Sequence, residues 1–154
     1  MKYPALSRFK FILLMVILSL AAYGQNVTAL IESNNFVFQL QSVSPMKGGL
    51  LMQNPGYTVT IGKDSVDCNL PYFGRMYNPS YGSTDSGLKF LSTQFEVKKD
   101  ARKKGGWNIN YKFADTKSVS KMLFTIFENG KASISVICKD RETISYSGFI
   151  EQRK

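Results

Sequence analysis

The sequence contains no histidine and only two cysteines among its 154 residues. The absence of histidine excludes Ser-His-Asp and Cys-His catalytic arrangements and every zinc site that uses imidazole. Two cysteines are too few for a four-thiolate site, so the sequence predicts no metal and no cofactor. An enzyme that uses only carboxylates remains compatible with the sequence, because glycosidases need just two acids about 5 to 10 Å apart. The chemically suitable acids, among which no spacing singles out a pair, are Asp64, Asp67, Asp85 and Glu96.

Long apolar runs are also scarce. The one clear run, Phe11–Leu20, follows three basic residues and precedes a small-residue ending at Gly24. It is too short to cross a bilayer as a helix, which takes about 20 residues. These features predict a signal peptide at residues 1–24, cleaved before Gln25, and export to the periplasm or the medium. The rest of the sequence has no second apolar span, so we expect no transmembrane segment in the mature chain. No cysteine lies near the cleavage point, so we expect no lipid anchor.

Acidic residues are few: 11 Asp and Glu stand against 20 Lys and Arg, giving a net charge of +9, or +6 without the leader's three cations. Such an excess favours anionic partners. For an exported protein these are lipid headgroups, acidic glycans or cell-wall polymers rather than nucleic acid, unless the charge serves only solubility. The densest basic segment, Lys98–Lys104, is expected to be a mobile hairpin loop.

Residues 25–154 have the length of a single domain. Their main pattern is alternation with period two, as where Phe36, Phe38 and Leu40 alternate with Val37, Gln39 and Gln41. A short helix is expected at residues 27–33. Further strands are expected at residues 57–61, 65–69, 88–91, 94–98, 107–113, 121–127, 131–138 and 143–151. The sequence thus predicts a mainly β fold, an antiparallel sandwich or a partly open barrel of about eight strands with a short N-terminal helix.

The strongest turn signal is Asn129-Gly130, because a two-residue type I′ turn needs positive φ at both central positions. This turn predicts that Phe127 pairs with Ala132, and that Leu123 and Val136 share one face. The strand at residues 121–127 is apolar on both faces. We therefore expect it to be central, with its second face covered by the helix or by another sheet.

The two cysteines, Cys68 and Cys138, fall in predicted strands and share the alternation of apolar neighbours. In an oxidising compartment they could form a disulfide closing a loop of about 70 residues, worth roughly 4 kcal/mol in the chain-entropy model. Two separate buried thiols are the alternative.

An unusual segment, Leu70–Gly82, combines three tyrosines, one phenylalanine and one arginine between proline and glycine residues. With the other motifs, this segment makes the chain resemble the bacterial domain of unknown function 4251 (DUF4251). Those other motifs are Pro45-Met46, the Asn129-Gly130 turn and the closing segment Lys139–Ser145. The resemblance covers nearly all of the mature chain and departs from the family pattern at Met76, where the family has a small alanine. It implies an exported β-rich protein and brings no activity or ligand.

The aromatic and cationic side chains of this segment could stack on sugar faces or hold an anion. The candidate ligand-binding residues are Tyr72, Phe73, Arg75, Tyr77 and Tyr81. Alternatively, the rings fold back as a plug over the open end of the sheet, with Arg75 paired to an acid. The leading functional hypothesis is a non-enzymatic binding or envelope-associated domain. A structural module that pairs with a protein partner through a strand edge or apolar face is second, and a carboxylate-based glycan hydrolase is third.

Overall fold

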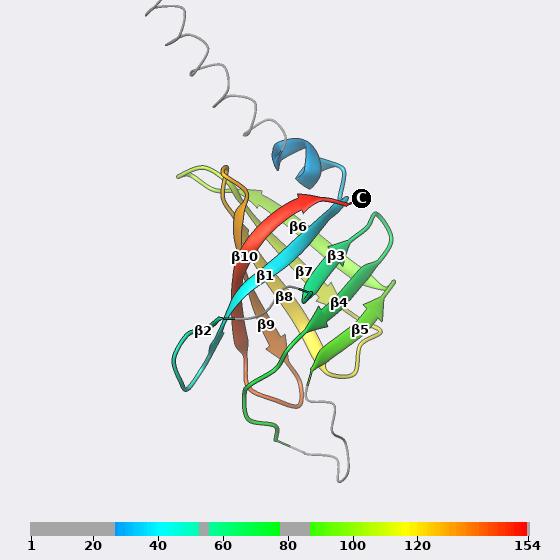
Figure 1. Cartoon of the computed structure of the whole chain (residues 1–154). Coiled ribbons are helices and arrows are strands. Elements are labelled where there is room, and N and C mark those ends of the chain that lie inside the picture. Colours follow the sequence, from blue (N-terminus) through cyan, green and yellow to red (C-terminus); the bar gives the residue numbers. More distant parts are fainter. Residues whose placement is uncertain (1–26, 53–55, 78–86, 154) are drawn as a thin grey trace, which may run out of the picture.

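Ten antiparallel strands form one sheet that curls into a nearly closed barrel (Figure 1). The computed structural model describes residues 27–52, 56–77 and 87–153, so the leader predicted at residues 1–24 lies outside the described residues. The strands are β1 (Phe36–Pro45), β2 (Leu51–Met52), β3 (Thr58–Ile61), β4 (Val66–Leu70), β5 (Leu88–Ser92), β6 (Phe95–Ala101), β7 (Trp107–Phe113), β8 (Val119–Ile126), β9 (Lys131–Cys138) and β10 (Ile144–Gln152). Their order is β5-β4-β3-β1-β10-β9-β8-β7-β6, and β2 pairs with β1.

The predicted mainly β fold is confirmed, and of the two architectures left open the structure is the barrel. Alternation places Phe36, Phe38 and Leu40 in the buried interior, as expected for a strand with one face on the core. The expected hairpin is also present, since β3 pairs with β4 through Val59 and Cys68. A short helix at residues 27–32 matches the predicted one and lies over one end of the barrel (Figure 1).

The helix is held by a lysine from the segment that the sequence predicted to be a loop. Strand β6 runs to Ala101, and Nζ of Lys99 donates a hydrogen bond to the carbonyl of Ile31 in the last turn of the helix. A cation here also interacts favourably with the helix dipole. Desolvation lowers the pKa of Lys99, while nearby Glu32 opposes the shift. The loop prediction is therefore wrong for the first part of Lys98–Lys104, because alternation turns Lys99 toward the barrel end.

The turn between β8 and β9 is one residue longer than predicted. The backbone N–H of Phe127 donates to the carbonyl of Lys131 (2.8 Å), and the N–H of Gly130 donates to the carbonyl of Phe127 (3.0 Å). Residues 128–130 thus form a three-residue loop in which only Gly130, with φ of 82°, is left-handed. Such loops need glycine at one position only, so an Asn-Gly pair fits them as well as a type I′ turn.

This extra residue shifts the register of β8 against β9. Val136 pairs with Met122 on the buried face, and Leu123 pairs with Ser135 on the outer face. The prediction that Leu123 and Val136 share a face is wrong, because a shift of one residue moves side chains to the opposite face. The outer face of β8 is also not covered as expected, since Leu123 and Phe127 are both exposed.

The two ends of the sheet, β5 and β6, are consecutive in the chain but not paired, and we call the gap between them the seam. Asp115 closes one end of the seam. Its carboxylate accepts hydrogen bonds from the hydroxyl of Ser92 (2.5 Å) and from the backbone N–H groups of Thr93 (2.9 Å) and Gln94 (3.1 Å). These bonds lower the pKa of Asp115, with the Ser92 hydroxyl contributing most.

The central strands β1 and β10 approach each other unusually closely at Gly148. A Cβ atom added there would lie 1.9 Å from the carbonyl oxygen of Gln39 and 3.0 Å from the Phe38 ring. The register of the pair shifts at the neighbouring Leu40 and Ser42. Glycine is needed here because any side chain would collide with backbone that cannot rotate away.

Candidate functional site

Four connections gather at the end of the barrel opposite the helix, which we call the loop end (Figure 1). They are the β1–β2 hairpin, residues 71–77, residues 114–118 and residues 139–143. Residues 139–143 link the others: the N–H of Lys139 donates to Ser118 (2.8 Å), and the N–H of Tyr77 donates to Asp140 (2.8 Å). Pro45, where the hairpin leaves β1, pairs with Ile144. The loop end is therefore one continuous surface built on rigid strands.

The segment 71–77 is fixed to the barrel by two buried tyrosines. The hydroxyl of Tyr72 is shared between the carbonyls of Arg75 (2.9 Å) and Glu142 (3.0 Å), and the hydroxyl of Tyr146 donates to the carbonyl of Pro71 (2.7 Å). Burial raises the pKa of Tyr72 to about 12, with Cys138 adding to the shift and Arg141 opposing it. Both tyrosines thus stay neutral hydrogen-bond donors and hold the base of the segment in one conformation.

A buried arginine packs on the inner side of this base. Nε and Nη2 of Arg141 donate to the two carboxylate oxygens of Asp140, each at 3.0 Å, and the guanidinium lies 5.0 Å from the centre of the Tyr72 ring. The hydrogen bonds raise the pKa of Arg141 and lower that of Asp140. The sequence analysis predicted that Arg75 would pair with an acid if this segment formed a plug. The structure instead pairs Arg141, and it leaves Arg75 exposed.

The predicted ligand-binding residues divide into an anchor and an exposed group. Tyr72 is buried, whereas Phe73 and Tyr77 are 48% and 64% exposed, and Arg75 lies exposed between them. Tyr81 lies outside the described residues. The plug alternative is therefore right for Tyr72 and wrong for Phe73 and Tyr77. The structure brings two ring faces and one guanidinium onto the solvent side of a single anchored segment, which we call the aromatic loop (residues 71–77).

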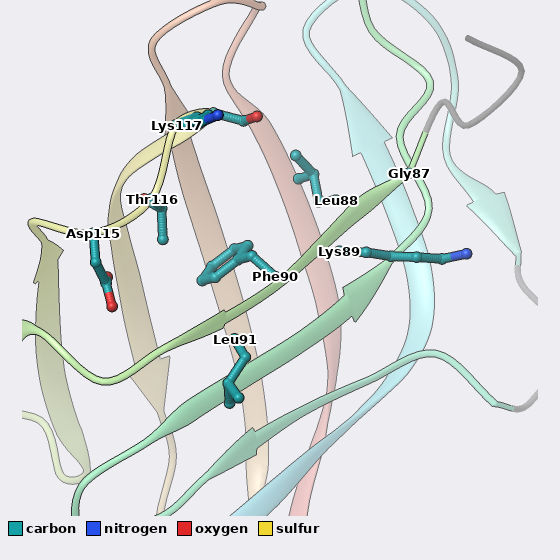
Figure 2. A pocket seen from close by; sticks show the side chains of 9 residues that line it. Gly87, Leu88, Lys89, Phe90, Leu91, Asp115, Thr116 and Lys117 are labelled. Carbon is teal, nitrogen blue, oxygen red and sulfur yellow. The ribbon is translucent and has the colours of Figure 1, made fainter.

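A groove of about 300 Å³ lies at the seam, between the unpaired edge of β5 and the 115–118 connection (Figure 2). The half-buried Phe90 ring faces this groove and contacts Phe113 at 5.3 Å, while Lys89 points away from it. Lys139 stiffens the opposite wall by donating from Nζ to the carbonyl of Thr116 (2.8 Å). The groove escaped sequence reasoning because it depends on which strands remain unpaired, and no local pattern encodes that.

A second, shallower groove of about 360 Å³ lies on the outer face of β7 and β8. Its walls include Asp100, Asn108, Asn110, Leu123 and Thr125. The hydroxyl of Thr125 donates to the side-chain carbonyl of Asn108 (3.3 Å), while the side-chain carbonyl of Asn110 has no hydrogen-bond partner. Polar and apolar side chains both line this groove, and it lies away from the loop end.

The two cysteines carry free thiols in the structure, so the disulfide considered from the sequence is not formed. Cys68 lies on β4 and Cys138 on β9, and these strands are separated in the sheet by β3, β1 and β10. Burial raises the pKa of Cys138 to about 11, against the opposing influence of Arg141, and raises that of Cys68 further. Both shifts favour the protonated thiol, which is a poorer nucleophile than the thiolate.

The acids considered for catalysis occupy separate places. Asp64 lies in the β3–β4 turn, Asp67 is exposed on β4, and Glu96 on β6 pairs with Lys112 at 3.4 Å. Asp85 lies outside the described residues. Among residues 27–52, 56–77 and 87–153, no group of three or more acids or cysteines could hold a metal ion. Within the same ranges, no helix has the length and apolar character needed to cross a membrane.

A nearly closed antiparallel barrel, with a helix over one end and hydrogen-bonded connections at the other, defines the class of this protein as a small β-barrel domain. Comparison with known proteins makes the assignment more specific. The chain belongs to the family described as a domain of unknown function, DUF4251, whose family model matches residues 20–150. The resemblance inferred from the sequence motifs is therefore confirmed.

The fold is similar to that of a solved relative, a DUF4251 family protein from Bacteroides eggerthii DSM 20697 whose crystal structure is known. The match has a TM-score of 0.62 at 13% sequence identity and covers 86% of this chain and 89% of the other. At this identity the likeness concerns the fold alone. No curated protein matches the chain.

Proposed function

We propose that this chain is an exported, non-enzymatic, envelope-associated domain that binds an anionic glycan or envelope polymer through the aromatic loop. The observation that carries the proposal is the exposure of Phe73 and Tyr77, at 48% and 64%, on a segment whose base is hydrogen-bonded to the barrel. Large rings held in water by a rigid base are pre-organised, so little conformational entropy is lost on binding.

The chemistry of the aromatic loop suits a carbohydrate that carries negative charge. Ring faces pack against the apolar faces of sugars, and a guanidinium binds carboxylate or sulfate groups through two parallel hydrogen bonds. Arg75 supplies the only charge within residues 71–77, and the net charge of +6 expected without the leader's three cations steers anions toward the protein. The absence of histidine and the separation of Asp64, Asp67 and Glu96 favour binding over catalysis.

Binding is tested by isothermal titration with polygalacturonate, a polymer of carboxylated sugars, and with neutral dextran. Replacing Phe73→Ala and Tyr77→Ala together, or Arg75→Gln alone, should weaken binding of polygalacturonate about tenfold, since each removes about 1 to 2 kcal/mol of contact energy. Phe149→Ala is the matched control, because Phe149 is also a partly exposed ring and lies on β10. Equal binding by all variants, or equal affinity for dextran, would contradict the proposal.

A second candidate is a protein-partnering role through the free edge of β5. The seam groove favours it, because an unpaired strand edge beside an apolar ring can accept an extended peptide as an additional strand. Peptides selected by display against the purified chain should then protect the amides of residues 88–91 from hydrogen exchange. Protection confined to other strands would count against this role.

A further inference from the structure

The β1–β2 hairpin exposes an unusual run of apolar side chains. Every residue from 46 to 52 is exposed, and Met46, Leu50 and Met52 are 63 to 75% exposed. Large apolar side chains that gather on one protruding element, rather than being scattered singly, mark a surface that contacts another apolar medium.

This hairpin packs neither of its faces on the barrel. Leu51 and Met52 are consecutive in β2, so their side chains point to opposite faces, yet both are exposed. Cβ atoms added at Gly48 and Gly49 would find no atom within 4 Å. The hairpin therefore projects from the loop end, as its position in Figure 1 also shows. A projecting tip is better suited to insertion into a lipid layer than to contact with a flat protein surface.

The hairpin tip and the aromatic loop each carry one cation, and these charges complement an anionic surface. Lys47 is the only charged residue in segment 46–52, and Arg75 is the only one in the aromatic loop at the same end of the barrel. Neither segment contains an acid, and the whole chain carries +9. Apolar side chains next to cations are typical of elements that bind the headgroup region of anionic bilayers.

We propose that segment 46–52 is a membrane-docking hairpin that inserts into the interface of a bilayer containing anionic phospholipid. Met46, Leu50 and Met52 enter the boundary between headgroups and acyl chains, and Lys47 extends its ammonium group back to the lipid phosphates. This inference goes beyond the function proposed above, because it concerns a different segment and a different ligand.

The test is flotation with vesicles of phosphatidylcholine, either pure or mixed with phosphatidylglycerol. The chain is expressed from its own start, and mass spectrometry records the first residue of each preparation, so that variants are compared with the same N-terminus. The triple variant Met46→Ser, Leu50→Ser, Met52→Ser should bind mixed vesicles at least tenfold more weakly than the wild type. Lys47→Gln should lose about fivefold on mixed vesicles and nothing on pure phosphatidylcholine.

The matched control is Leu91→Ser, which removes a 65% exposed leucine from β5 and should change vesicle binding less than twofold. A local readout is Leu50→Trp, whose fluorescence should be quenched by brominated acyl chains, while Leu91→Trp should not respond.

Three outcomes overturn the proposal. They are equal flotation of wild type and triple variant, no quenching of Leu50→Trp, or loss of self-association rather than of vesicle binding in the triple variant, which would assign the hairpin to a second copy of the chain. The double variant Phe73→Ala, Tyr77→Ala separates the two functions, because it should weaken polygalacturonate binding about tenfold and keep most vesicle binding.

Discussion

The close approach of β1 and β10 at Gly148 makes a strong prediction about stability. In Gly148→Ala, the new methyl group would lie 1.9 Å from the Gln39 carbonyl oxygen, so the two central strands must separate by well over an ångström. This pair connects the β3–β5 half of the sheet to the β6–β9 half. The strain therefore falls on the β1–β10 pairing, which holds the two halves of the barrel together.

The magnitude follows from two opposing effects. Overpacking a tight site costs about 1 to 3 kcal/mol, and a clash with backbone belongs at the upper end of that range. Alanine also restricts the unfolded chain, which returns about 0.4 to 1 kcal/mol. We expect a net loss of about 2 kcal/mol, a large share of the roughly 5 to 15 kcal/mol that stabilises a typical domain.

The assay is urea unfolding followed by the fluorescence of Trp107, the only tryptophan in the chain. With a typical slope of about 1 to 3 kcal/mol per molar urea, the midpoint of Gly148→Ala should fall by about 1 to 2 M. Gly49→Ala is the matched control, because a Cβ there meets nothing, so only the restriction of the unfolded chain remains and its midpoint should rise slightly. A Gly148→Ala midpoint indistinguishable from that of Gly49→Ala would refute the argument.

Three further predictions concern polar groups. Tyr72→Phe should lower stability by about 1 kcal/mol in the same urea assay, because the carbonyl of Glu142 loses its donor; no change would show that water replaces the hydroxyl. The pKa of Asp115 is lowered in the fold, so its stabilisation is full well above the unfolded pKa of about 3.9 and is lost as pH falls through the folded pKa. The midpoint difference between wild type and Asp115→Asn should accordingly shrink between about pH 5 and pH 2, and a constant difference would contradict this. Because burial raises the pKa of both thiols, Ellman's reagent at about pH 8 should label Cys68 and Cys138 only after urea is added; fast labelling of Cys68 in the folded protein would oppose this.

Local patterns predicted much of the fold because most strands have one buried face. The alternation around Phe36 and Phe38 and the hairpin through Val59 and Cys68 needed no information from distant residues. The pairing of β1 with β10, by contrast, joins residues 99 to 116 positions apart in the sequence. Period-two alternation gives the face of a strand but not its partner, so the barrel could not be separated from a sandwich.

The errors share a physical cause, which is that one local signal can satisfy two geometries. Asn129-Gly130 fits a two-residue or a three-residue loop, and the difference of one residue reversed the face of Val136. The aromatic loop was identified from its composition, yet nothing local distinguishes buried Tyr72 from exposed Tyr77. That difference depends on the carbonyl of Glu142, which comes from a different part of the chain.

The pairing of Phe36 with Gln152 brings the first and last strands together at the helix end, far from the aromatic loop. A label attached at Gln152 should therefore leave the aromatic loop and the β1–β2 hairpin, at the opposite end of the barrel, accessible to their ligands.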